Sequence, residues 1–114
     1  MIIKLGGIYL AALDPVIGRE ISKTRPVLVV SNNINNKFSG TITVLPLTSG
    51  NIEKVYPFEV FLPKGIGNLP KASKVKADQI RTLDRSRIIK MIGALDKETM
   101  IQVKEAMKCH LDMD

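Results

Sequence analysis

Two short runs, residues 27–31 and 41–47, constrain the fold of this chain more than any other feature. Both are predominantly apolar, and both place apolar side chains on the two faces of a strand. Such runs are typical of strands in a closed barrel, or in a sheet that another element covers. The segment between them, residues 32–40, is rich in asparagine and other turn formers. The two runs therefore predict an antiparallel hairpin.

Arg25 and Thr48 flank the two runs, and the register of the hairpin brings them together. If the hairpin is centred near Asn36 and Lys37, the numbers of paired positions sum to 73, which places Arg25 opposite Thr48. Opposed side chains of antiparallel strands have Cβ atoms about 5 Å apart. Because Pro26 restricts the residue before it to an extended backbone, the direction of Arg25 is also constrained. We expect a cation beside a hydroxyl at this end of the hairpin.

The rest of the chain is predicted to form further short strands and one helix. Strands are expected at residues 7–13, 56–62 and 73–80, the last running into 81–84, with a short β-like stretch at 88–92. Asp96 is a good N-cap for a helix that ends near Leu111. One apolar stripe at helical spacing is expected to be core or subunit contact: Met100, Val103, Met107 and Leu111. Five or six strands with a C-terminal helix predict a mainly β fold with α, a small barrel, in one domain over residues 1–114.

The chain is basic, with 17 lysine and arginine residues against 11 acidic residues, a net charge of +6 and a pI near 9.6. This balance favours a polyanionic partner such as nucleic acid or an acidic protein segment. Many soluble proteins are mildly basic, so charge alone leaves both interpretations open. The chain has no tryptophan and few other aromatic residues, so it is poorly supplied for a base-stacking platform of the single-strand-binding type.

Several classes of site and location are disfavoured by the composition. The chain has one histidine, His110, beside its one cysteine, Cys109, so there is no ligand cluster of zinc spacing and no marked triad. The acidic residues are scattered, and the glycines form no phosphate-binding loop. We therefore expect neither a metal nor a cofactor. No apolar run reaches the length of a membrane span, and the apolar stretch at the start of the chain is too short for a signal peptide. A single cysteine cannot form an intramolecular disulfide, so we expect a reducing compartment, the cytoplasm.

Metal-free cleavage of RNA is the chemistry that these residues can support, because RNA supplies its own nucleophile, the 2′-hydroxyl. Arg25 can clamp phosphate oxygens with its planar fork, and Thr48 can donate a hydrogen bond to a non-bridging oxygen. Glu20, or a water near it, can accept a proton. Other roles are common at such positions: an arginine before a strand often forms a surface salt bridge, and a threonine at a strand end often stabilises a turn. From spacing alone these ordinary roles come first.

Several blocks of the chain together resemble the MazF/PemK family of toxin endoribonucleases, which belong to type II toxin–antitoxin systems. The resemblance covers nearly the whole chain in the same order. Its specific parts are three blocks: Gly-x-Glu at residues 18–20, Arg-Pro-Val at residues 25–27 and Asp-Gln-Ile-Arg at residues 78–81. Further matching blocks are residues 7–9, 14–17, 28–32, 36–37, 46–49, 56–60 and 82–84.

The resemblance implies an SH3-like small barrel with a C-terminal helix, the fold of the MazF, CcdB and Kid toxins, and a homodimer. It implies sequence-specific cleavage of single-stranded RNA, chiefly mRNA, without metal, and neutralisation by a MazE-like antitoxin. The family's catalytic arginine and threonine match Arg25 and Thr48, and its acidic loop residue matches Glu20. The remaining contacts to RNA are expected from Ile17, Lys23, Asn32, Ser49, Asp78 and Gln79. The loops at residues 16–24 and 51–55 do not reveal which RNA sequence is cut.

Two other functions are compatible with the same fold. A CcdB-like poison of DNA gyrase would be a binder and not an enzyme, but such proteins end in a Trp-Gly-Ile motif. This chain ends in Leu111-Asp112-Met113-Asp114 and contains no tryptophan, which argues against that function. An inactive binding relative is the other alternative, and the presence of both Arg25 and Thr48 counts against it.

Overall fold

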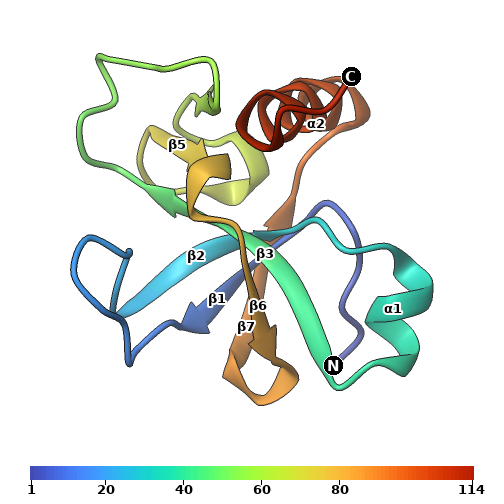
Figure 1. The fold of residues 1–114 in the computed structure, drawn as a ribbon. Helices are drawn as coiled ribbons and strands as arrows, with labels where there is room; N and C mark the ends of the chain where they lie inside the picture. The colour runs from blue at the N-terminus through green and yellow to red at the C-terminus, as the bar shows by residue number, and fades with distance from the viewer.

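The computed structural model describes residues 1–114, in which most of the regular structure is β (Figure 1). The strands are β1 (Gly7–Ala12), β2 (Thr24–Val29), β3 (Thr41–Thr48), β4 (Glu59–Leu62), β5 (Ser73–Lys76), β6 (Arg81–Asp84) and β7 (Ile88–Ala94). The helices are α1 (Asn33–Phe38) and α2 (Lys97–Leu111), and three single turns of 3-10 helix are η1 (Ile66–Asn68), η2 (Ala77–Gln79) and η3 (Arg85–Arg87).

Strand β3 is the centre of the sheet, because it pairs with three other strands. One of its edges pairs with β2, while the other edge pairs with β6 near its start and with β5 near its end. The sheet runs in the order β4-β5-β3-β2-β1-β7, and all of its pairings are antiparallel. The ring of strands does not close. The fold is nevertheless the mainly β fold with a C-terminal helix that the sequence predicts, with an open barrel in place of a closed one.

The predicted hairpin register is confirmed. Its observed pairs are Val27 with Pro46, Leu28 with Leu45, and Val29 with Val44, and each pair sums to 73. The connection is not the simple turn that we expected, because residues 33–38 form the helix α1. Asparagine caps this helix: the side chain of Asn32 accepts a hydrogen bond of 2.8 Å from the backbone N–H of Asn35.

Both faces of the central strands are buried, as the two apolar runs predict. The first core cluster lies on the face that α2 covers and includes Leu28, Leu45, Leu47, Val75 and Val103. The second cluster lies on the opposite face and includes Tyr9, Val27, Val29, Val44 and Leu83. Neighbouring residues of a strand point to opposite faces, so a single apolar strand contributes to both clusters. The sheet therefore holds the two halves of the core together.

Several predicted boundaries differ from the observed ones. The fourth strand starts at Glu59 and not at residue 56, and the fifth stops at Lys76, where η2 begins. Residues 81–84 form a separate strand that pairs with β3, so there are seven strands and not five or six. The long-range pairing that produces β6 has no local signal in the sequence.

The C-terminal helix follows its predicted bounds, and its predicted stripe is only partly covered. The side chain of Asp96 accepts a hydrogen bond of 2.7 Å from the N–H of Thr99, so it is the N-cap. Val103 is fully buried and packs in the first cluster, whereas Leu111 is exposed. None of the helices has the length and apolar character needed to cross a membrane.

Candidate active site

Arg25 and Thr48 line one small pocket at the end of the β2–β3 hairpin. Its volume is about 170 Å³. Its walls come from the start of β2, the end of β3 and the segment that leads into β5: Arg25, Pro26, Leu47, Thr48, Ser49, Leu69, Pro70, Lys71 and Ser73. The structure thus brings the predicted cation and hydroxyl together, and it adds Lys71 as a second cation. The sequence carries no signal for Lys71, because this residue reaches the pocket through the pairing of β5 with β3.

The guanidinium of Arg25 is oriented but not neutralised. Its Nε donates a hydrogen bond of 3.2 Å to the backbone carbonyl of Ser22, and its terminal nitrogens make no hydrogen bond within the protein. No carboxylate forms an ion pair with it, so the surface salt bridge considered from the sequence does not occur. The two terminal nitrogens remain available to an anion in the pocket.

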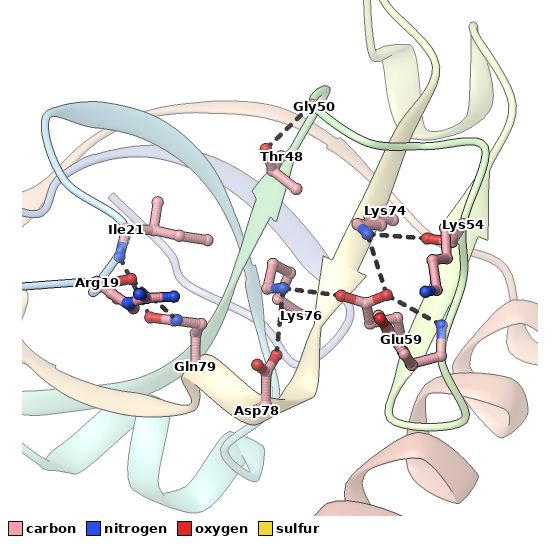
Figure 2. A network of polar contacts seen from close by, with 11 residues as sticks. Arg19, Ile21, Thr48, Gly50, Lys54, Glu59, Lys74, Lys76, Asp78 and Gln79 are labelled. Atoms are coloured by element: carbon pink, nitrogen blue, oxygen red, sulfur yellow. Dashed lines mark hydrogen bonds and ion pairs between the residues drawn. The ribbon is translucent and has the colours of Figure 1, made fainter.

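The hydroxyl of Thr48 keeps its proton free. Its Oγ1 accepts a hydrogen bond of 3.1 Å from the N–H of Gly50, so Thr48 does stabilise a turn, which is the ordinary role considered for it. Because this bond uses a lone pair of the oxygen, the hydroxyl hydrogen can still be donated to a ligand. Figure 2 shows this contact at the end of β3.

Glu20 lies in the loop between β1 and β2 and does not line the Arg25–Thr48 pocket. Its carboxylate accepts a hydrogen bond of 2.7 Å from the N–H of Ile17, and its own N–H donates to the carbonyl of Ile17 at 3.3 Å. Glu20 therefore closes a tight turn. The side chain of Ile17 is 83% exposed at the tip of this turn, where it is free to contact a ligand.

Gln79 and Lys23 fix the rest of this loop. The side-chain oxygen of Gln79, on η2, accepts a hydrogen bond of 3.2 Å from the N–H of Ile21, and its nitrogen lies 3.4 Å from the carbonyl of Arg19 (Figure 2). The N–H of Lys23 donates to the carboxylate of Asp14 at 3.0 Å. The contacts of Gln79 show how η2 positions a loop almost 60 residues away in the sequence.

The other predicted contact residues lie in different places. Ser49 lines the pocket directly after Thr48. Asp78 lies on η2, where its carboxylate is 3.7 Å from the ammonium of Lys76 and one of its oxygens is buried without a hydrogen bond. Asn32 is not brought to the pocket: it lies past the opposite end of β2 from Arg25 and caps α1.

A buried ionic cluster beside the pocket has no counterpart in the sequence-based predictions. The carboxylate of Glu59 on β4 binds two ammonium groups of β5, Lys74 at 3.1 Å and Lys76 at 2.8 Å (Figure 2). The side chains of Glu59 and Lys74 are 1% and 5% exposed. The only feature of the sequence that points to this cluster is the Lys-x-Lys spacing of residues 74–76, which puts both lysines on one face of a strand. It could not be interpreted without the pairing of β4 with β5, in which Glu59 lies opposite Lys76.

The ionic cluster joins the pocket to the loop that follows β3. Lys74 is the direct partner of Thr48 in the β3–β5 ladder. Its ammonium also donates a hydrogen bond of 3.0 Å to the carbonyl of Lys54, while the carboxylate of Glu59 accepts one of 3.0 Å from the N–H of Tyr56. The segment from Gly50 to Phe58 is therefore fastened to β4 and β5 by buried charges.

These hydrogen bonds set the pKa of Glu59. Burial raises the pKa of its carboxyl, but hydrogen bonds from Lys76, from the N–H of Tyr56 and from Lys74 together outweigh that effect, and the pKa lies below its ordinary value. Glu59 is therefore ionised at neutral pH.

Comparison with known proteins identifies the family. The model of the PemK-like, MazF-like toxin of type II toxin–antitoxin systems matches residues 4–111. The chain belongs to this family. It is 41% identical over 113 residues to the endoribonuclease MazF9 of Mycobacterium tuberculosis, with 95% of each chain covered.

Solved structures agree with this assignment. The Form-I crystal structure of MazF from Deinococcus radiodurans has a TM-score of 0.85 and 31% identity, with 99% of each chain covered. The Form-II crystal structure of MazE–MazF from the same organism has a TM-score of 0.78 and 30% identity, with 100% of this chain and 99% of that chain covered. The resemblance found in the sequence is confirmed, and the CcdB-like alternative is not supported.

Replacement of Glu59 by glutamine tests the ionic cluster. Because its pKa is lowered in the folded state, Glu59 stabilises the protein above the pKa of its unfolded form, and this stabilisation is lost as pH falls through its folded pKa. Removing one partner of a buried ion pair typically costs about 3–5 kcal/mol. We expect Glu59→Gln to be destabilised most at neutral pH, and the difference from the wild type to shrink on acidification.

Urea unfolding over a pH series measures this difference. The matched control is Glu105→Gln on α2, where the carboxylate lies 3.7 Å from Lys108 in an exposed pair that contributes little. A difference between wild type and Glu59→Gln that stays constant over the pH series would show that the charge of Glu59 is not what stabilises the fold.

Proposed function

We propose that this protein is an endoribonuclease toxin that cleaves single-stranded RNA, chiefly mRNA, at specific sequences. The observation that carries the proposal is the pocket that Arg25 and Thr48 share. In it, the terminal nitrogens of the guanidinium and the hydroxyl proton of Thr48 are not used in hydrogen bonds within the protein. Membership of the MazF-like toxins, and similarity to a protein named as an endoribonuclease, support the same activity. We infer that it acts in the cytoplasm, where mRNA is translated.

In the proposed reaction the 2′-hydroxyl of the substrate attacks the adjacent phosphorus, and the bond to the 5′-oxygen of the next nucleotide breaks. A 2′,3′-cyclic phosphate and a new 5′-hydroxyl are formed. Arg25 clamps the non-bridging oxygens and stabilises their charge, and Thr48 donates a hydrogen bond to one of them. The pKa of a free arginine side chain lies far above neutral pH, so Arg25 stays protonated and serves as a clamp and hydrogen-bond donor and not as the base. The departing 5′-oxygen takes its proton from water.

Glu20 is the proposed proton acceptor, acting through a water. One of its carboxylate oxygens closes the turn at Ile17, and the other makes no hydrogen bond within the protein. We propose that the loop carrying Glu20 contacts the RNA through Ile17 and Lys23. Ser49, Asp78 and Gln79 lie on or next to the elements that form the pocket and hold this loop, so we retain them as RNA contacts.

The proposed reaction needs no metal ion, because Arg25 and Thr48 supply the charge and hydrogen bond that a metal would otherwise provide. The protein also has no candidate metal site, because no group of three or more histidine, cysteine, aspartate or glutamate side chains lies close enough to hold a metal ion. The protein's own donors are therefore expected to suffice.

A MazE-like antitoxin is the proposed protein partner, by analogy with the MazE–MazF structure of Deinococcus radiodurans. An apolar groove of about 580 Å³ runs along α2, and three lysines line it: Lys97, Lys104 and Lys108. Such a surface fits an acidic tail with apolar anchors. We also infer a homodimer, because a chain this short leaves large apolar side chains exposed, among them Ile2, Leu5, Ile101 and Met113.

Substitutions in the pocket test the catalytic residues. Arg25→Ala and Thr48→Ala should each lower the cleavage rate by about 100- to 1,000-fold, the usual effect of losing one preorganised donor. Arg25→Lys should also be impaired, because an ammonium cannot reproduce the planar fork of the guanidinium. Single-turnover cleavage measures the rate. The matched control is Thr82→Ala on β6, an exposed threonine opposite the other end of β3. Wild-type rates for Arg25→Ala would refute the site.

The origin of the nucleophile and the role of metal can be tested together. We expect full activity in excess EDTA, since no step needs a divalent ion. A single 2′-deoxy substitution 5′ to the cut should abolish cleavage, whereas the same substitution elsewhere should not. Mass spectrometry should identify a 2′,3′-cyclic phosphate on the first product. Loss of activity in EDTA with recovery in magnesium would overturn the mechanism, and so would efficient cleavage of an all-DNA oligonucleotide.

Competition between antitoxin and RNA tests the proposed partner. Charge attraction should speed association and weaken with salt, while apolar anchors should hold the complex once it has formed. We therefore expect saturating antitoxin to block RNA binding, and added salt to slow association more than it speeds dissociation. Stopped-flow binding with labelled RNA measures both rates. Unchanged RNA binding in saturating antitoxin would rule out a shared groove.

A further inference from the structure

Two aromatic rings stack in the loop between β3 and β4. The rings of Tyr56 and Phe58 have centroids 5.3 Å apart and planes inclined by 2°, so they lie parallel. Phe58 in turn contacts the ring of His110 on α2, with centroids 6.4 Å apart. Tyr56, at the outer end of this series, is 43% exposed. Phe58 and His110 thus pack on one side of the series, and the ring of Tyr56 at the other end is partly exposed to solvent.

The buried ionic cluster holds Tyr56 in place. The N–H of Tyr56 donates to the carboxylate of Glu59 at 3.0 Å. The carbonyl of Lys54 accepts from the ammonium of Lys74, also at 3.0 Å (Figure 2). Glu59 and Lys74 are themselves bonded to each other. An aromatic residue fixed in this way loses little conformational freedom when a ligand stacks on it.

Tyr56 is also within reach of an RNA strand that occupies the pocket. Thr48 on β3 pairs with Lys74 on β5, which pairs with Phe61 on β4, so these side chains share one face of the sheet. Adjacent strands lie about 4.8 Å apart, which puts β4 about 10 Å from β3. On this face Lys74 is buried and its ammonium bonds the loop that follows Thr48, so a strand of RNA that leaves the pocket over this face runs across that loop, which carries Tyr56.

A positive charge accompanies the ring. The ammonium of Lys54 lies 5.0 Å from the centroid of the Tyr56 ring, and the side chain of Lys54 is exposed. A cation–π contact at an exposed site is weaker than the stacking of a nucleobase on an aromatic ring. A base can therefore replace the lysine at the ring, and the released ammonium can then bind a phosphate.

We infer that Tyr56 and Lys54 form a nucleotide subsite for single-stranded RNA, outside the cleaved bond. The base stacks on Tyr56, and Lys54 binds a neighbouring phosphate. This inference rests on the proposed ribonuclease function and extends the contact surface beyond the pocket. Every base has a flat face, so the subsite adds affinity without selecting one base. It acts on substrate binding and not on the chemical step.

Substitutions at Tyr56 separate stacking from simple packing. Tyr56→Phe keeps a flat ring, Tyr56→Leu keeps apolar bulk without one, and Tyr56→Ala removes both. With a single-stranded RNA made uncleavable by one 2′-deoxy substitution, we expect Tyr56→Leu and Tyr56→Ala to raise Kd about tenfold and Tyr56→Phe to stay near wild type. On cleavable RNA the same two variants should raise KM about tenfold with kcat unchanged. Lys54→Gln should reduce the slope of log Kd against log salt concentration by about one, which corresponds to one counterion fewer released on binding.

A second exposed cation–aromatic pair provides the matched control. The ammonium of Lys37 lies 5.4 Å from the ring of Phe38, which is 77% exposed on α1, on the other side of the molecule from the segment that carries Tyr56 (Figure 1). We expect Phe38→Ala to bind RNA as the wild type does.

The outcomes distinguish the subsite from the function on which it rests. Wild-type affinity in Tyr56→Ala, in a preparation whose wild type cuts RNA, would refute the subsite alone. Equal losses in Tyr56→Phe and Tyr56→Leu would also refute it, because the flat ring would not be what matters. A wild type that neither cuts nor binds single-stranded RNA would refute the proposed function and the subsite together. Thermal unfolding of each variant shows whether a loss of binding is a loss of fold.

Discussion

The pairing of β2 with β3 is the interaction on which the rest of the structure depends. It brings Arg25 and Thr48 to one pocket, and it joins the two core clusters on opposite faces of the sheet. The other edge of β3 pairs with β5 and β6, so the positions of these two strands also depend on β3. A shift of one residue would turn every side chain of the ladder to the other face, which would separate the guanidinium from the hydroxyl and disrupt both clusters. Packing and the candidate chemistry thus depend on the same register.

Buried charge connects this central ladder to the functional loops. Glu59 and Lys74 lie almost without solvent contact and satisfy backbone groups of the loop that follows Thr48. Buried ion pairs often add little net stability compared with apolar residues of the same size, but they permit few alternative arrangements. In this protein the pair defines where the backbone of Lys54 and Tyr56 lies. On the other side of the pocket Gln79 does the same for the loop of Glu20 with neutral hydrogen bonds. The loop after Thr48 is held by Glu59, which directly follows it in sequence, and by Lys74 of β5, whereas the loop of Glu20 is held by Gln79 of η2, which is distant in sequence.

Local patterns predicted the fold wherever one strand or helix carried its own signal. The runs before and after residues 32–40 gave the hairpin register, and Asp96 with its apolar stripe gave α2. The short helix α1 was missed because six residues rich in asparagine carry turn signals and no apolar period. Asn32, which stays a predicted RNA contact, caps this helix. The low aromatic content argued against a stacking platform, yet pairing and buried charge display Tyr56 on Phe58 at the surface.

The sequence by itself determined the small mainly β domain, the family, the basic charge and the juxtaposition of Arg25 with Thr48, because each depends on short periods, composition or one hairpin. Tertiary structure alone decided which side chains surround that pair. Lys71 enters the pocket, Glu59 binds Lys74 and Gln79 binds the distant loop only after β4, β5 and η2 have packed against β3. These contacts join segments far apart in the chain, and their register is set by the burial of both faces of the sheet and not by any local propensity.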